Sequence, residues 1–119
     1  MNEEYLNTFL LLKNPLGHMA EFIVAKIDEI PNGTGKVVFA GDKPIALFNI
    51  NGTFYAIDNT CAHRGGPLGE GDLGGTIVTC PWHGWQFDVT TGVSPFGPTV
   101  EKYEVKLDSQ TQEIKVVVP

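Results

Sequence analysis

Two short segments of the 119-residue chain hold both of its cysteines and two of its three histidines. Cys61 and His63 are separated by one residue, and Cys80 and His83 follow after an interval of sixteen residues. Thiolates and neutral imidazoles are ligands that zinc and iron–sulfur clusters both accept, so two close pairs of them predict a four-ligand metal site. A structural disulfide is the alternative use of two cysteines, but the histidines beside them favour metal binding.

The pairing of these side chains separates two kinds of metal site. A common zinc finger takes two cysteines from one segment and two histidines from the other, whereas each segment here is mixed. Mixed pairs allow two loop tips to meet across a binuclear cluster, each loop giving a cysteine to one iron and a histidine to the other. The pattern therefore favours a [2Fe-2S] cluster, with a structural zinc site as the alternative.

The segments that must position these loops have the pattern of an all-β protein. From Glu21 onward, short apolar runs are separated by turn signals, and no stretch of helical length has a 3.6-residue period. Residues 59–75 are rich in glycine and are predicted to form a loop. Strands are predicted at 22–27, 36–40, 44–50, 53–58, 76–79, 85–88, 100–107 and 114–118.

Two of these strand predictions carry more detail. Asn51 and Gly52 predict a two-residue hairpin turn, because both accept the positive φ angles of a type I′ turn. Tyr103, Val105 and Leu107 alternate with charged residues, which predicts one buried and one exposed face for their strand.

The sequence around the four candidate ligands resembles the two motifs of the Rieske family of [2Fe-2S] proteins. The stretches CAHRGGPL at 61–68 and CPWHGWQFD at 80–88 match those motifs in ligands, spacing and flanking glycines. The segment PFGP at 95–98 is similar to the family's third, proline-containing loop. The resemblance implies a Rieske-type antiparallel β-sandwich with a small loop-built cluster-binding subdomain. That domain would span 19–119, with cluster-binding loops at about 59–68, 80–86 and 94–98, and residues 1–18 would be an atypical N-terminal extension.

The resemblance also implies a role for each ligand and one cluster per chain. Cys61 and Cys80 would bind the inner iron, while His63 and His83 would bind the outer iron near the surface, where electrons enter and leave. Glycines beside the ligands would let backbone N–H groups approach sulfur closely. The residues expected around the cluster are Arg64, Gly65, Gly66, Trp82, Gly84, Trp85 and Pro95.

The chain departs from the high-potential Rieske proteins of respiratory and photosynthetic complexes. Those proteins carry a disulfide between the two loops, at positions where this chain has Gly66 and Trp82. They also place hydroxyl groups, which donate hydrogen bonds to sulfur, where this chain has Trp85 and Phe87. Fewer such bonds stabilise the reduced cluster less, so we expect a potential toward the bottom of the Rieske range of roughly −150 to +300 mV.

Length and charge exclude several functions. A chain of 119 residues is one domain without room for a catalytic domain, and His18 alone is left over for the mononuclear iron site of an oxygenase. A net charge of −6 with a single arginine argues against nucleic acid and anionic membranes as partners. No secretory signal or membrane span is predicted, so the cytoplasm is the expected compartment.

The sequence therefore predicts a one-electron carrier rather than an enzyme. Its expected partners are a flavin-containing reductase and an oxygenase or reductase that accepts the electrons. One alternative is the small subunit of an assimilatory NAD(P)H nitrite reductase. The other is a redox-inert zinc or interaction module.

Overall fold

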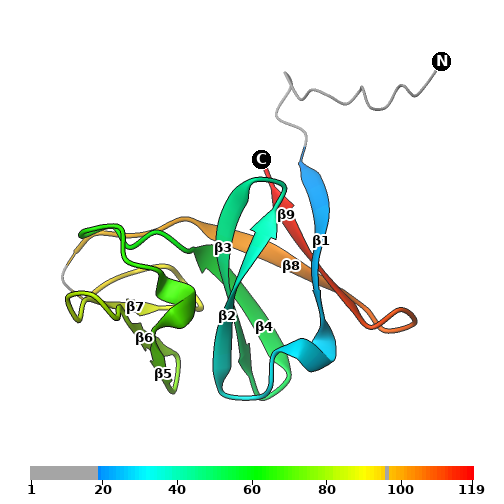
Figure 1. Ribbon diagram of the computed structural model, residues 1–119, viewed down its shortest axis with the longest axis horizontal. Helices are drawn as coiled ribbons and strands as arrows, with labels where there is room; N and C mark the ends of the chain where they lie inside the picture. The colour runs from blue at the N-terminus through cyan, green and yellow to red at the C-terminus, as the bar shows by residue number, and fades with distance from the viewer. Residues whose placement is uncertain (1–18, 96) are drawn as a thin grey trace.

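A computed structural model of the chain describes residues 19–95 and 97–119, and within them the protein is built from short antiparallel strands (Figure 1). Two single-turn 3₁₀ helices interrupt the strands, η1 (Ile27–Glu29) and η2 (Leu68–Glu70). The predicted extension 1–18 and Phe96 of the predicted third loop lie outside the described residues. The strands are β1 (Ala20–Lys26), β2 (Thr34–Ala40), β3 (Lys43–Ile50), β4 (Thr53–Asp58), β5 (Asp72–Gly74), β6 (Ile77–Thr79), β7 (Gln86–Asp88), β8 (Lys102–Asp108) and β9 (Glu113–Val118).

The strands form two antiparallel sheets. The larger sheet has the order β1-β9-β8-β4-β3-β2 and curls until its edge strands β1 and β2 come into contact. The smaller sheet, β5-β6-β7, lies to one side of it and carries the loops at that end of the molecule (Figure 1). The predicted all-β fold class is confirmed, and every predicted strand lies within two residues of an observed one.

Strand β5 falls inside the segment that was predicted to be a loop, so that prediction was wrong for Asp72–Gly74. The strand has three residues, of which Leu73 alone is apolar, and a strand of this length is too short to show a period. Leu73 pairs with Val78 of β6. The predicted cluster-binding subdomain thus contains a small sheet as well as loops.

The detailed predictions for the large sheet are mostly confirmed. Asn51 and Gly52 have φ angles of 55° and 88° and join β3 to β4. On β8, Tyr103 is buried and Val105 is half-buried, as predicted. Leu107 was predicted to be buried but is 47% exposed, because it lies near the β8–β9 turn, which projects beyond the curled sheet (Figure 1).

Strand β3 separates two hydrophobic cores. Ile45 and Leu47 point into the core of the curled sheet, while Ala46 and Phe48 point into a second core beneath β5-β6-β7. Successive side chains of a strand point to opposite faces, so the four consecutive apolar residues at 45–48 can serve both cores. The second core also contains Cys61 and Cys80. The fold therefore buries both candidate cysteine ligands in the same core.

Candidate metal centre

The first candidate loop is a tight hairpin that begins at Cys61. The backbone N–H of Cys61 donates a hydrogen bond to the carbonyl of Gly66 at 2.9 Å, and the N–H of Gly65 donates to the carbonyl of Cys61 at 2.9 Å. Outside this ring, Thr60 and Pro67 form an isolated antiparallel bridge. Gly65 has a φ of 80°, which few side-chain-bearing residues adopt, so glycine is required at this point of the turn.

The second candidate loop repeats the same backbone pattern. The N–H of Cys80 donates to the carbonyl of Trp85 at 2.7 Å, and the N–H of Gly84 donates to the carbonyl of Cys80 at 3.0 Å. Gly84 has a φ of 78°, close to that of its counterpart Gly65. The two hairpins, residues 61–66 and 80–85, therefore present a cysteine at equivalent positions.

Cys61 and Cys80 lie next to each other at the point where the hairpins meet. Each is 3% exposed, and both are free thiols. Burial raises the pKa of the Cys61 thiol and the neighbouring Cys80 side chain raises it further, whereas backbone N–H groups of His63 and Arg64 aimed at the sulfur act in the opposite direction. Two buried sulfurs with amide dipoles pointing toward one of them suit thiolates bound to metal.

His63 and His83 form a second pair of candidate ligands. Their ring centroids are 5.2 Å apart, with the rings nearly perpendicular at 84°. Burial lowers the pKa of His63, and the charges of Arg64 and His83 lower it further, which favours the neutral ring that binds metals. Nδ1 of His63 is buried and has no hydrogen-bond partner among the described residues. A buried nitrogen without a partner is expected where a metal ligand is needed.

The donors thus come as a pair of sulfurs and a pair of imidazoles. Among residues 19–95 and 97–119, no three or more His, Cys, Asp or Glu side chains are grouped to bind one metal ion. The donor chemistry and the unpartnered nitrogen fit a binuclear iron–sulfur cluster, which takes two thiolates and two imidazoles in its Rieske form.

Two of the residues expected around the cluster link the hairpins. A Cβ on Gly66 would lie 2.6 Å from Sγ of Cys80 and 3.0 Å from Cγ of Trp82, so the absence of a side chain at this position lets the hairpins approach. The indole of Trp85 stacks on the imidazole of His63, with ring centroids 4.4 Å apart. Both contacts cross from one hairpin to the other.

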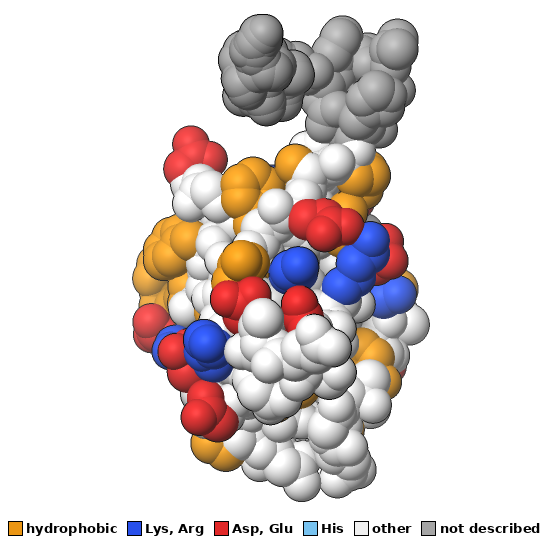
Figure 2. All heavy atoms as spheres, turned by 90° about the vertical axis from the view of Figure 1, so that its right-hand side faces the viewer, with side chains coloured by type: hydrophobic (Ala, Val, Ile, Leu, Met, Phe, Trp, Pro, Cys, Tyr) orange, Lys and Arg blue, Asp and Glu red, His pale blue; other side chains and the backbone are white. Residues whose placement is uncertain are grey.

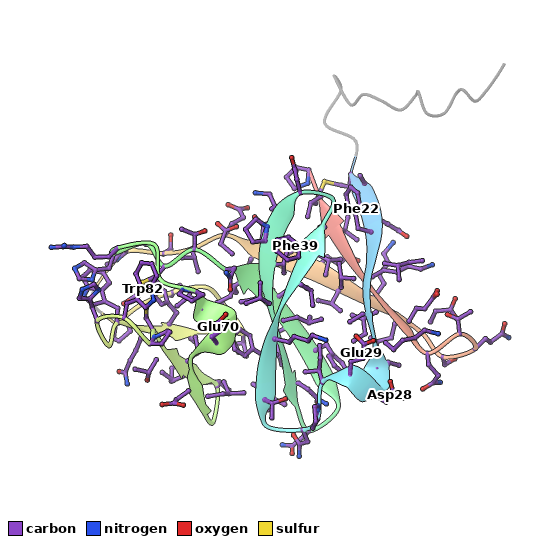
Figure 3. All side chains as sticks on the ribbon, in the orientation of Figure 1. Phe22, Asp28, Glu29, Phe39, Glu70 and Trp82 are labelled. Carbon is purple, nitrogen blue, oxygen red and sulfur yellow. The ribbon has the colours of Figure 1, made fainter. Side chains whose placement is uncertain are left out.

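The other expected neighbours have different surroundings. Arg64 is exposed, and Trp82 is 58% exposed at the end of the molecule that carries the hairpins (Figure 3). Pro95 lines an apolar pocket of about 450 Å³ with Ile77 and Val93, and its place beside the cluster stays a prediction.

Sequence reasoning did not single out Asn59, which the structure places at the base of the first hairpin. Its side chain is buried and its Oδ1 accepts a hydrogen bond from the N–H of Gly69 at 2.8 Å. The available signal was an asparagine between the end of an apolar strand and the first cysteine, because such side chains often bond to nearby backbone groups.

The family to which the chain belongs follows from comparison with known proteins. The family model described as the Rieske [2Fe-2S] domain matches residues 20–113. The chain belongs to the Rieske [2Fe-2S] domain family. The Rieske domain binds one [2Fe-2S] cluster per chain, so the predicted family and cofactor are confirmed.

Relatives of this Rieske protein include ferredoxins of dioxygenase systems. It is 35% identical over 95 residues to the ferredoxin component of the naphthalene 1,2-dioxygenase/salicylate 5-hydroxylase systems of a Ralstonia species, an alignment covering 77% of this chain and 91% of the relative. It resembles a chain in the solved complex of reduced oxygenase and oxidized ferredoxin of carbazole 1,9a-dioxygenase with a TM-score of 0.72 and 31% identity, covering 81% and 91% of the two chains.

The fold is also shared with a putative NADH-dependent nitrite reductase small subunit from Mycobacterium tuberculosis. The TM-score is 0.77 at 22% identity, and the match covers 86% of this chain and 97% of the other. At this identity the likeness shows the fold alone.

These comparisons confirm the prediction of an electron carrier rather than an enzyme, because the relatives are named as ferredoxin components. In the part of the chain that the structure describes, no helix is both long enough and apolar enough to cross a membrane.

Proposed function

We propose that this Rieske protein is the ferredoxin of a ring-hydroxylating dioxygenase system, taking single electrons from a flavin-containing reductase and delivering them to the oxygenase. The observation that carries the proposal is Nδ1 of His63, a buried atom with no hydrogen-bond partner among the described residues. His63 lies beside His83, on the same pair of hairpins as the two buried thiols. The 35% identity to a dioxygenase ferredoxin supports this type of system.

The proposal includes the ligand of each iron. Cys61 and Cys80 would hold the inner iron, because both sulfurs belong to the buried core. His63 is half-buried and His83 is exposed, so the histidines would hold the outer iron toward solvent. When bound, the cluster supplies a one-electron acceptor and donor, and the histidine side gives partners the shorter path to it.

The surface supports docking at the hairpin end. Figure 2 shows the opposite end of the molecule, where lysines and carboxylates are interspersed. Lys106 of β8 and Glu21 of β1 form an ion pair with a distance of 2.6 Å. The hairpin end instead exposes Trp82 and the single arginine, Arg64. An exposed aromatic side chain and an exposed guanidinium on the two hairpins suit a partner surface with apolar and acidic groups.

The remaining parts of the proposal concern boundaries and compartment. The family match to residues 20–113 supports a Rieske domain at 19–119 with residues 1–18 outside it. Two cysteines used as cluster ligands rather than as a disulfide support the cytoplasm.

The small subunit of a nitrite reductase is the second candidate, because a protein of that description shares this fold and the fold alone does not separate the two functions. The two candidates differ in how tightly the chain is bound to its partner. Stable co-purification with a large flavin- or haem-containing subunit would favour the second candidate, whereas a free chain that exchanges electrons with a separate oxygenase would favour the first.

The deciding experiment is analysis of iron and sulfide in the purified chain, followed by a redox titration read by visible absorption and EPR. We expect about two irons and two sulfides per chain, and a potential in the lower part of the range of roughly −150 to +300 mV. Replacing any one of the four ligands with alanine should abolish the cluster, whereas His18→Ala serves as the control histidine and should retain it. A colourless chain with one zinc would overturn the proposal.

A further inference from the structure

The two hairpins that carry the proposed ligands are unequally supported. The hairpin at 80–85 continues the β6–β7 ladder, in which Thr79 pairs with Gln86 and Val78 pairs with Phe87. The hairpin at 61–66 lies between the end of β4 and the 3₁₀ helix η2, and its ladder is continued by the isolated bridge between residues 60 and 67. The base of the first hairpin must therefore be held closed by contacts other than a regular strand pair.

Asn59 supplies that closure through its backbone and its side chain. Its carbonyl accepts a hydrogen bond from the N–H of Leu68 at 2.7 Å, which extends the hairpin ladder by one pair. Its Oδ1 accepts from the N–H of Gly69 at 2.8 Å, and both groups are buried. The Asn59 side chain is therefore the acceptor for a backbone donor that water does not reach.

The segment bonded to Asn59 is itself fixed to the large sheet. A Cβ on Gly69 would lie 2.8 Å from Cγ2 and 2.9 Å from the backbone N of Val37, so η2 rests directly on the backbone of β2. The side chain of Leu68 is fully buried beside it. The bond between Asn59 and Gly69 thus ties the end of β4 to a turn that cannot move away from β2 without losing this packing.

The other side of β4 is also anchored next to Asn59. The backbone N–H of Asp58 donates to the carbonyl of Glu101 at 2.9 Å, and Oδ1 of Asp58 accepts from the hydroxyl of Tyr103 at 2.5 Å. The chain therefore enters the first hairpin from a residue held on β8, and leaves it through a turn held on β2.

We propose that Asn59 is a positioning residue for the cluster, keeping the first hairpin closed so that Cys61 and His63 stay aligned with the second hairpin. The inference rests on the proposed ligand set and extends it. Without the side-chain oxygen, the buried N–H of Gly69 has no hydrogen-bond acceptor. The N–H can then form a hydrogen bond to water only if the base of the hairpin opens.

The test compares substitutions at Asn59 with a matched control at Asn49. Asn49 is equally buried, at 8% against 9% exposure, and its side chain bonds to the carbonyl of Ile30 and the N–H of Gly52 in the curled sheet. Asn59→Leu removes the acceptor, whereas Asn59→Asp replaces the amide oxygen with a carboxylate oxygen that can still accept the hydrogen bond. Asn49→Leu removes an unrelated buried amide.

The measurements are the rate of cluster release from the folded, loaded protein, read by visible absorption, and visible circular dichroism of the cluster. We expect Asn59→Leu to release the cluster about tenfold faster than the wild type and to alter the dichroism, because one buried hydrogen bond of the hairpin is lost. Asn59→Asp should restore most of the retention. Asn49→Leu should lower the melting temperature but leave the release rate within about twofold.

Amide exchange of the cluster-free proteins gives a second readout. Residues 61–69 should exchange faster in Asn59→Leu than in the wild type, while residues 80–86 should not.

If Asn59→Leu does not fold, Gly69→Ala displaces the same N–H from the other side of the bond and should also accelerate release. Equal release rates for the leucine variants at 59 and 49, or no rescue by aspartate, would overturn the positioning role. A wild type without iron and sulfide would overturn the proposed function instead.

Discussion

The imidazole ring of His63 lies parallel to the indole ring of Trp85, with 3° between the ring planes and 4.4 Å between the centroids. The two residues belong to different hairpins, so the stack joins the hairpins and also orients a proposed iron ligand. An aromatic pair of this kind contributes about 0.5–1.5 kcal/mol beyond its buried area.

Replacing Trp85 should therefore disturb His63. We expect Trp85→Ala to release the cluster about two- to tenfold faster, and Trp85→Phe, which keeps a ring for stacking, to stay close to the wild type. The measurement is cluster release by visible absorption together with the EPR g-values, which report on the orientation of the histidine ligand. Identical spectra and rates for the alanine and phenylalanine variants would show that the stack does not position His63.

The candidate ligands could be proposed, and most strands predicted, because their signals are local. The cysteine–histidine spacing lies within each motif, and the turn at Asn51 and Gly52 depends on the conformational preferences of two adjacent residues. The stack of Trp85 on His63 joins residues of different loops, so neither motif alone indicates which ring contacts which. Recognising it required the tertiary arrangement of the two hairpins.

The errors and omissions have related causes. The exposure of Leu107 follows from the reach of the β8–β9 turn beyond the sheet, and alternation along one strand cannot indicate where its neighbours end. Asn59 is one polar residue between two patterned segments, and its importance depends on Gly69, ten residues later. Hydrogen bonds of this kind have no periodic signature in the sequence.

Gly66 offers a steric test of how closely the hairpins approach. We expect Gly66→Ala to destabilise the loaded protein by about 1–3 kcal/mol and to reduce its iron content, because the new Cβ would lie 2.6 Å from Sγ of Cys80. Gly74→Ala is the matched control, since a Cβ there meets no atom within 4 Å. Iron content and melting temperature check the prediction, which fails if both variants bind iron equally well.

Tyr103 should make stability depend on alkaline pH. Burial raises the pKa of its phenol above the ordinary value near 10, and the hydrogen bond to Asp58 and the charges of Asp58 and Glu101 raise it further. Because the folded-state pKa is the higher one, the stabilising contribution is fully present below about pH 10 and is lost as the pH rises from there toward the folded-state pKa.

The corresponding variant is Tyr103→Phe, with Tyr55→Phe on β4 as the control. We expect Tyr103→Phe to cost about 1–2 kcal/mol at pH 7, because the carboxylate of Asp58 loses its phenol donor. The variant should also lose less stability than the wild type between pH 9 and 11. Urea unfolding midpoints across that pH range measure the effect, and parallel curves for the wild type and Tyr103→Phe would contradict it.

Arg64 should steer an acidic partner toward the hairpin end. It is exposed beside the proposed ligand His63, in a chain whose net charge is −6. We expect Arg64→Gln to slow association with the oxygenase about three- to tenfold at low ionic strength and much less at high salt, because screening weakens long-range attraction between charges.

Lys106→Gln makes the same change of charge at the opposite end, beside Glu21, and should leave association unchanged. Stopped-flow electron transfer at several salt concentrations distinguishes the two variants. A salt-independent effect of Arg64→Gln, accompanied by a shifted potential, would assign Arg64 to tuning the cluster instead of docking.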